Sequence, residues 1–467
     1  MTRPEAPLDL SRPGRYHVVG VGGPGMSAIA LTLAEMGHDV SGSDVRELSV
    51  LDRLRAAGVT VHVGHDRDHV KGVDAVTAST AIPAGNVELV AAAEDGVTVL
   101  RRAGMLAAIC AQADALAVAG THGKTTTTSM LAMVLAEAGL DPSYVVGGDL
   151  HEVGTGAHWS GGQWLVVEAD ESDGTHLELP LAGTILTNVE ADHLDHYGTF
   201  DAVVEAFDRY LAQVDGPKVL CADDPVTADL AARHDAITYG IDAGARYRAR
   251  DIGTAEGALR FVVDRDGTEL GEVVVPLRGL HNVRNALGAI AMADAVGVPF
   301  AATARALARF GGVARRFDVR GRHEGITLVD DYAHLPGEIA AVLAAATGSG
   351  DGWTRCVAVF QPNRYNRMAV LSPEYADAFV DADVAVLTDI YPSGQAPIPG
   401  VTGKLVVDAV CDAHPEQRVV WLPERADLVA FLIGELRPGD VCISMGCGDV
   451  AELPDEVLAG LVRKVRS

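Results

Sequence analysis

Short apolar runs alternate with longer stretches rich in alanine, leucine and methionine along the whole chain. Runs of Val, Ala, Ile and Leu predict strands, as at 16–19 and 115–119, and the stretches that follow predict helices, as at 26–36. Strands that alternate with helices are typical of α/β proteins, in which the strands are parallel and sites lie at their carboxyl ends. We therefore predict an α/β fold.

The pattern divides the chain into three self-contained parts. A chain of 467 residues is long enough for about three domains of roughly 150 residues. We place them at 1–105, 106–315 and 316–467. Within 240–278 the pattern changes to apolar alternation around Asp266-Gly-Thr, which predicts β-hairpins in an antiparallel appendage of the second part.

Composition and charge narrow the possible partners. Hydrophobic residues make up 48% of the chain, which is ample for buried cores, and the net charge of −27 with no basic run argues against nucleic acid. No apolar run reaches the length of a membrane span, and the amino terminus lacks a signal pattern. The six cysteines form no C-x-x-C pair, as expected for reduced thiols. We predict a cytoplasmic protein that binds neither nucleic acid nor membrane.

A phosphate-binding loop is the strongest chemical signal. The predicted strand at 115–119 ends in Gly120-Thr121-His122-Gly123-Lys124-Thr125-Thr126, and a helical run follows to Gly139. Glycines let backbone N–H groups surround an anion at the helix N-terminus, the lysine reaches terminal phosphates, and the threonine hydroxyl reaches Mg²⁺. The motif is shorter than the standard G-x-x-x-x-G-K-[ST], because Val118 stands where the first glycine would be.

A second glycine turn follows the first predicted strand. Residues 20–25 match G-x-G-x-x-G, and the next predicted strand ends in Asp44. This pattern favours a nucleotide-type ligand without saying which one. Read alone, it would suit a dinucleotide-dependent oxidoreductase, an interpretation that leaves the Gly-Lys-Thr loop unexplained.

Acidic and histidine side chains follow two strands in the part that carries the phosphate loop. Glu168 ends the strand 165–167, and His193 lies in a turn after the strand 184–188. Glu168 with Thr125 suits Mg²⁺, which prefers oxygen ligands, whereas a histidine is a less usual ligand for it. The alternative is that such residues cap helices or lie in solvated turns.

Other polar loops leave alternatives open. Asn282, which follows a predicted turn at Gly279, could cap a helix or contact an adenine edge. Arg316, in the pair Arg315-Arg316, could stabilise charge on a transferring phosphoryl group or form an interdomain salt bridge. Arg364 and Arg367 suit a carboxylate or phosphate ligand, because a guanidinium binds both oxygens of such groups.

Taken together, these motifs resemble the Mur ligase family, the ATP-dependent amide-bond ligases of peptidoglycan precursor synthesis. The shortened Gly-Lys-Thr loop is that family's form of the phosphate motif. The matching signatures span nearly the whole chain in the family's order: Gly20-x-Gly-Gly-x-Gly-Met26, Glu168-Ala-Asp-Glu-Ser-Asp173, Asn188-x-Glu-Ala-Asp-His193, Gly279-x-His-Asn-x-x-Asn285, Arg315-Arg-Phe, Asp330-Asp-Tyr-x-His334 and Phe360-Gln-Pro.

The resemblance implies a Rossmann-like first domain, a P-loop ATPase-like central domain and a Rossmann-like third domain, with ATP and Mg²⁺ as cofactors. Carried over by position, the resemblance gives the ligands of Mg²⁺ as Thr125, Glu168 and His193. It gives the ATP contacts outside the phosphate loop as Asn282, Arg316 and Asp331. It gives the residues on the UDP-sugar and amino-acid side as Gly22, Gly23, Gly25, Met26, Asp44, Ser79, Tyr332, His334, Arg364 and Arg367. The residues it implies in catalysis are Lys124, Glu168, His193, His334, Arg364 and Arg367.

Within the family, the signatures are most similar to those of members that join L-alanine to the lactyl carboxylate of UDP-N-acetylmuramate through an acyl phosphate. The implied partners are therefore UDP-N-acetylmuramate and L-alanine, and we expect a monomer or weak homodimer.

Departures from the family pattern keep two alternatives open. Leu335 and Asn363 stand where the family usually has histidine, and both loops belong to the amino-acid side, so a catalytically impaired homologue is one alternative. The other is a murein peptide ligase, which adds a peptide to the same sugar nucleotide but usually has tyrosine where Ser172 stands. Asp208 stands where some members carry a carbamylated lysine, and Gly104 replaces an expected glutamate.

Overall fold

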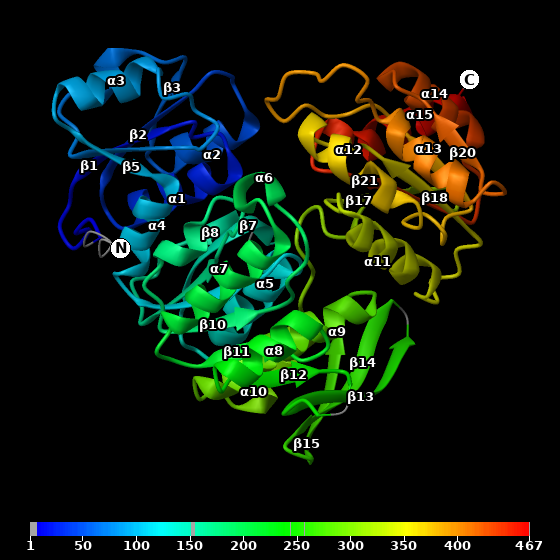
Figure 1. Ribbon diagram of the computed structural model, residues 1–467, viewed down its shortest axis with the longest axis horizontal. Helices are drawn as coiled ribbons and strands as arrows, with labels where there is room; N and C mark the ends of the chain where they lie inside the picture. The colour runs from blue at the N-terminus through cyan, green and yellow to red at the C-terminus, as the bar shows by residue number, and fades with distance from the viewer. Residues whose placement is uncertain (1–6, 151–154, 243, 256, 467) are drawn as a thin grey trace. The chain divides into compact units, whose positions relative to one another are not determined.

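The computed structural model describes residues 7–150, 155–242, 244–255 and 257–466 (Figure 1). Three sheets follow one another along the chain, each built from strands that alternate with helices, so the predicted three-domain α/β fold is confirmed. The boundaries of the three domains stay a prediction. No helix in the described part of the chain is both long and apolar enough to cross a membrane.

The first sheet has five parallel strands in the order β3-β2-β1-β4-β5. Its strands are β1 (Arg15–Val19), β2 (Asp39–Asp44), β3 (Thr60–Val63), β4 (Ala75–Ala78) and β5 (Thr98–Arg101). The helices between and after them are α1 (Pro24–Glu35), α2 (Ser49–Ala56), the short 3₁₀ helix η1 (Arg67–Val70), α3 (Val87–Glu94) and α4 (Arg102–Cys110). Parallel pairing through helical crossovers places the glycine turn at the carboxyl end of the central strand β1.

The second sheet has ten strands in the order β15-β14-β13-β12-β11-β10-β6-β9-β7-β8. The strands are β6 (Asp114–Ala119), β7 (Ser143–Leu150), β8 (Thr155–His158), β9 (Trp164–Glu168), β10 (Gly183–Leu186), β11 (Lys218–Cys221), β12 (Ile237–Gly240), β13 (Tyr247–Ala255), β14 (Ala258–Arg265) and β15 (Thr268–Val275). The helices are α5 (Lys124–Glu137), η2 (Thr175–Glu178), α6 (Leu194–Tyr197), α7 (Phe200–Ala212), α8 (Pro225–Arg233), α9 (Leu280–Ala295) and α10 (Phe300–Ala308).

The strands β13–β15 correct one expectation. This region was expected to form β-hairpins in an antiparallel appendage of the second part, but β13 pairs with β12 in parallel, so the three strands continue the second sheet. The phosphate-loop strand β6 lies well inside this sheet, between β10 and β9, and is parallel to both. The loops that follow these three neighbouring strands therefore meet at one sheet edge.

The third sheet has six strands in the order β16-β17-β21-β18-β19-β20, and only the edge strand β16 is antiparallel to its neighbour. Its strands are β16 (Asp318–His323), β17 (Ile326–Asp331), β18 (Arg355–Phe360), β19 (Val384–Leu387), β20 (Val419–Trp421) and β21 (Asp440–Met445). Its helices are α11 (Pro336–Thr347), α12 (Tyr365–Leu371), η3 (Ser372–Tyr375), α13 (Lys404–Ala413), α14 (Arg425–Glu435), η4 (Asp449–Glu452) and α15 (Leu453–Arg466).

The contacts group the described residues into two compact units. The first unit comprises 1–251 with 261–275 and 283–311, and the second comprises 252–260, 276–282 and 312–467. The first two sheets share one apolar core. The third sheet has its own core on each face, because alternate residues of a strand point to opposite sides: Cys356, Ala358 and Phe360 of β18 lie in one core, and Val357 and Val359 lie in the other.

Candidate active site

The phosphate loop connects β6 to α5 in a backbone conformation that needs glycine. Gly120 and Gly123 have φ angles of +126° and +80°, which side chains with a Cβ rarely adopt. A Cβ at Gly123 would overlap Oδ1 of Asn285, and one at Gly120 would overlap the Thr187 hydroxyl. The main-chain N–H of His122 donates to Oδ1 of Asn188 at 2.9 Å, which fixes the loop against the strand end after β10. The loop is therefore held in this conformation by contacts with its neighbours.

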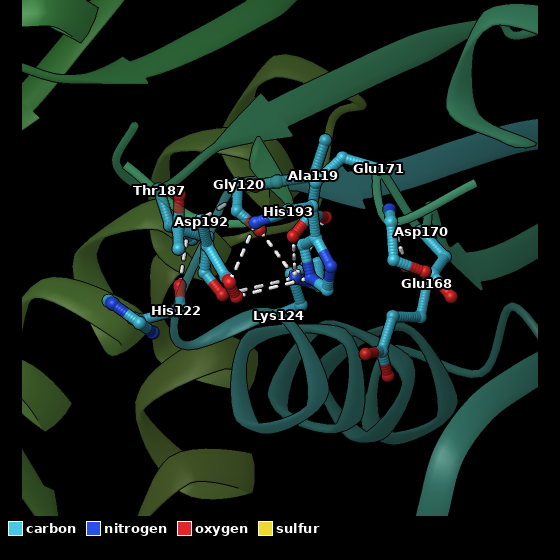
Figure 2. Close-up of polar contacts among 12 residues, drawn as sticks. Ala119, Gly120, His122, Lys124, Glu168, Asp170, Glu171, Thr187, Asp192 and His193 are labelled. Atoms are coloured by element: carbon cyan, nitrogen blue, oxygen red, sulfur yellow. Dashed lines mark hydrogen bonds and ion pairs between the residues drawn. The ribbon is translucent and has the colours of Figure 1, made fainter. Parts of the chain in front are cut away.

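Lys124 begins α5, and its ammonium group lies inside the loop. Its Nζ donates to the carbonyl oxygens of Gly120 and Thr121 at 2.5 and 3.1 Å and to Oε1 of Glu171 at 2.9 Å (Figure 2). Burial raises the pKa of Glu171 to about 7, against the opposing pull of Lys124. Burial opposes the charge of Lys124, yet the carboxylates around it, Glu171 foremost, raise its pKa. The lysine therefore keeps its charge, and Glu171 is the member of the pair that titrates near neutral pH.

Two of the three residues expected to hold Mg²⁺ lie together. The Thr125 hydroxyl donates to Oε1 of Glu168 at 3.2 Å, and Oε2 of Glu168 accepts from the N–H of Gly147 at 2.8 Å. Nε2 of His193 pairs with Oδ2 of Asp192 at 3.1 Å. A hydroxyl next to a carboxylate is a suitable pair of oxygen ligands for Mg²⁺, so Thr125 and Glu168 fit the ion.

Around the glycine turn of the first sheet, the structure brings three expected residues together. The N–H of Gly22 donates to Oδ2 of Asp44 at 3.0 Å, and a Cβ at Gly20 would touch Ser79 at 3.3 Å. Gly23 accepts a bond from the N–H of Met26 at 3.0 Å, but the Met26 side chain is buried in the core shared by the first two sheets. The turn therefore offers backbone groups and the Asp44 carboxylate to a ligand.

Arg102 connects this turn to the acidic loop after β9. Its Nη1 is the group that a Cβ at Gly25 would meet, at 3.2 Å, and its Nη2 donates to Asp170 and Asp173 at 2.6 and 3.0 Å. Arg102 lies outside the residues expected from the sequence, as do Asn285 and Glu171. Glu171 and Asn285 each lie in a motif that stands out in the sequence. The sequence does not show that Glu171 contacts Lys124 or that Asn285 lies against Gly123.

In the second unit, the loop after β17 holds Asp331 and Tyr332. Asp331 accepts from the N–H groups of Phe317 and Ala333, both at 2.7 Å, and burial raises its pKa to about 6. The guanidinium of Arg316 lies over the Tyr332 ring at 5.2 Å from its centroid. Arg315 pairs with Asp330 at 3.0 Å, within the same unit. Arg315 also lies over the Tyr332 ring, at 5.0 Å from its centroid, so both arginines contact Tyr332 and only Arg315 is described in an ion pair with Asp330.

The remaining predicted residues of the second unit lie at or near the N-terminal ends of α11, α12 and α9. Nδ1 of His334 is 3.2 Å from Oε2 of Glu338. Nη1 of Arg367 donates to Oδ1 of Asn363 at 2.8 Å, and Arg364 adopts a φ of +62° at the start of α12. The Asn282 amide donates to the carbonyl of Arg278 at 2.7 Å.

Of the departures from the family pattern, Leu335 is buried in the core of the third sheet. Asp208 pairs with Arg233 and His234 at 3.0 and 2.8 Å.

Family models match the chain in three consecutive segments. They are the Mur ligase family, catalytic domain, over residues 15–114, the Mur ligase middle domain over 118–293, and the Mur ligase, glutamate ligase domain over 315–448. The chain belongs to the Mur ligase family. The resemblance drawn from the sequence motifs is thereby confirmed.

Relatives and solved structures match nearly the full length. The chain is 46% identical to a UDP-N-acetylmuramate–L-alanine ligase of Acidothermus cellulolyticus, covering 98% of this chain and 97% of the relative. It is 44% identical to the protein of that name from a Bradyrhizobium species, covering 96% and 98%. The crystal structure of a UDP-N-acetylmuramate-alanine ligase from Thermotoga maritima has a TM-score of 0.82 at 28% identity, covering 97% and 100%. A murein peptide ligase from Psychrobacter arcticus has a TM-score of 0.70 at 25% identity, covering 96% and 98%.

Proposed function

We propose that this Mur ligase joins L-alanine to the lactyl carboxylate of UDP-N-acetylmuramate, with ATP converted to ADP and phosphate, in the cytoplasm. The observation that carries the proposal is the phosphate loop that encloses Lys124 beside the Thr125–Glu168 pair. The names of the relatives at 44% and 46% identity support the choice of sugar nucleotide and amino acid.

The reaction needs ATP because a carboxylate is a poor electrophile. Transfer of the γ-phosphoryl group to the lactyl carboxylate breaks the terminal anhydride bond of ATP and forms an acyl phosphate. The amine of alanine then attacks the acyl carbon, loses a proton, and expels phosphate as the amide forms. Phosphoryl transfer depends mainly on positioning and on charge stabilisation, which is the role we give to Lys124.

Thr125, Glu168 and His193 would hold Mg²⁺, which supplies positive charge beside the phosphates when bound. Glu171 would release Lys124 to the nucleotide, since its carboxyl group can take up a proton near neutral pH. In the second unit we give contacts with ATP to Asn282, Arg316 and Asp331. We give contacts with the amino acid and lactyl carboxylate to Tyr332, His334, Arg364 and Arg367.

The glycine turn of the first sheet would bind the UDP part of the substrate. Gly22, Gly23 and Gly25 present backbone at the carboxyl end of β1, and the carboxylate of Asp44 is in place to accept from a ribose hydroxyl. Ser79 borders the same turn. This leaves the phosphate loop to ATP and gives the two glycine-rich turns separate ligands.

Phosphate release tests the proposal. The purified chain is given ATP, Mg²⁺ and UDP-N-acetylmuramate. L-alanine, glycine, L-serine or a murein tripeptide, the kind of acceptor that a murein peptide ligase uses, is then added in separate reactions. Release that depends on L-alanine is the expected result, with the amide product confirmed by mass spectrometry. Release with the tripeptide alone would identify a peptide ligase instead, and no release with any acceptor would identify an impaired homologue.

A further inference from the structure

A buried carboxylate in the first sheet is surrounded by histidines, away from the phosphate loop. Glu88 lies in the first turn of α3 and is completely buried. Its Oε1 is 2.7 Å from Nδ1 of His69 and 3.5 Å from Nε2 of His17, and its Oε2 is 2.8 Å from Nδ1 of His65. None of these side chains has a part in the proposed ligase reaction.

The atoms are spaced as ligands of one ion would be. One ligand atom each from His17, His69 and Glu88 lie within 4.8 Å of one another, and this is the one such trio of histidine, cysteine or acidic residues found in the described part of the chain. Nitrogen and oxygen ligands at about 2.0 to 2.2 Å around a tetrahedral Zn²⁺ are roughly 3.3 to 3.6 Å apart. The His17–Glu88 separation of 3.5 Å already lies in that range.

His17 is the ligand held least tightly. Its side chain is fully buried, and Nε2 makes only a long contact of 3.5 Å with Oε1 of Glu88. A buried imidazole nitrogen gains from a closer ligand, which a metal ion between the two side chains would supply. The opposite ring nitrogen, Nδ1, is 2.8 Å from the Ser41 hydroxyl, which is the outer contact that orients metal-binding histidines.

Three separate elements deliver the ligands. His17 lies in β1, His69 in η1 and Glu88 in α3, and η1 packs against α3. The His69 ring is stacked on His62 at 3.9 Å between centroids, which limits its rotation. His65, which contacts Oε2 of Glu88, also lines a surface pocket together with Asp66 and Val87.

We propose that His17, His69 and Glu88 form a binding site for Zn²⁺ or a similar divalent transition metal, with a structural role in the first sheet. Two imidazoles and one carboxylate are a donor set that suits Zn²⁺ and is a poor one for Mg²⁺. The bound ion would give Nε2 of His17 a closer partner and would connect β1, η1 and α3.

Calorimetric titration with ZnCl₂ tests the site on the full chain, stripped with a chelator and kept in excess Mg²⁺ to occupy the oxygen-ligand site. One equivalent should bind to the wild type. Loss of a side chain that only supports a metal ligand typically lowers metal affinity by roughly 10- to 100-fold. His69→Gln removes a ligand itself, so its Zn²⁺ affinity should fall by at least this factor. His234→Gln is the matched control, because His234 is similarly buried and pairs with Asp208 at 2.8 Å without a second histidine.

Two outcomes would overturn the proposal. One is unchanged Zn²⁺ affinity in a folded His69→Gln variant. The other is loss of the Zn²⁺ equivalent in His193→Gln and not in His69→Gln, since that would place the ion at the predicted Mg²⁺ site.

X-ray absorption of the Zn²⁺-loaded wild type gives an answer that needs no variant. Scattering from two imidazole rings is expected at the proposed site. Scattering from one ring or none would exclude the site, because His193 is the only histidine among the three predicted Mg²⁺ ligands. An accompanying rise in the melting temperature with Zn²⁺ would agree with a structural role.

Discussion

Lys124 combines burial, three polar contacts and a place at the N-terminus of α5. Replacing it by alanine removes the positive charge that the phosphate loop would place beside the transferring phosphoryl group. We therefore expect Lys124→Ala to lower kcat/KM by about 10³-fold or more in the phosphate-release assay. Lys404→Ala is the control, because that lysine is exposed and pairs with Asp408 on the surface of α13. Near wild-type turnover in a folded Lys124→Ala variant would refute the role given to the loop.

Glu171 makes stability depend on pH. Its pKa is about 7 in the folded protein and near 4.5 in an exposed glutamate, so the folded state holds the proton more tightly. The resulting stabilisation is complete below about pH 4.5 and is lost as the pH rises to about 7. In Glu171→Gln this loss is absent. Urea unfolding at pH 5, 6, 7 and 8 measures this effect. The free energy of unfolding of the variant, relative to that of the wild type, should rise with pH by a few kcal/mol at most.

The exposed Glu94 gives the control for this titration. Glu94→Gln removes a carboxylate that is 58% exposed and pairs with Arg67 at 3.1 Å, and an arginine stays charged from pH 6 to 8, so the stability difference from the wild type should stay nearly constant over this range. A Glu171→Gln difference that is equally flat would mean that Glu171 is ionised throughout this range.

At the residue scale, the sequence predicts which residues belong to the site better than it predicts which residues contact one another. Lys124, Thr125 and Glu168 could be named from strand ends and a phosphate motif, and Thr125 and Glu168 do lie in contact. The bond from Lys124 to Glu171 could not be named, because it depends on how far the loop after β9 turns back towards α5. The role of Arg102 depends likewise on packing between distant segments.

The loop that joins β6 to α5 needs glycine at two positions, and for one of them, Gly123, the chain offers a matched control at Gly139. Gly123 and Gly139 both have positive φ angles, +80° and +76°, but a Cβ at Gly139 would meet nothing within 4 Å. Gly139→Ala should therefore cost roughly 1–2 kcal/mol from backbone strain alone. Gly123→Ala carries the same strain and in addition pushes against Asn285, so it should be less stable than Gly139→Ala in urea unfolding. It should also bind ATP more weakly by calorimetry. Equal stability and equal ATP binding of the two variants would contradict this account.

Local patterns predicted the elements themselves well. The strand and helix around the first glycine turn were expected at 16–19 and 26–36 and are found at Arg15–Val19 and Pro24–Glu35. Such patterns arise from neighbouring residues, which a sequence displays directly. The parallel pairing of β13 with β12 was not predicted, since strand pairing depends on residues far apart and a hairpin pattern looks the same whether it extends a sheet or forms an appendage.

The described part of the chain combines an apolar core shared by the first two sheets with two cores that belong to the third sheet. Leu33 of α1 and Met105 and Ile109 of α4 belong to the same apolar cluster as Leu165 of the second sheet. The two cores of the third sheet contain only residues from 326 onwards. The first two sheets should therefore depend on each other for stability, whereas the third should not depend on either.

Two fragments of the chain test this difference. A fragment of residues 312–467 keeps both cores of the third sheet and loses the contacts that 252–260 and 276–282 make within the second unit, such as the Arg278–Asp351 pair, so we expect a single cooperative thermal transition with native-like circular dichroism. A fragment of residues 1–111 loses the cover that β7 and β8 give to α1 and that η2 gives to α4, so it should bind a hydrophobic dye and melt without a sharp transition. A cooperative 1–111 fragment beside an unfolded 312–467 fragment would show that the division into cores does not govern folding. Two cooperative fragments would show that the core shared by the first two sheets is dispensable.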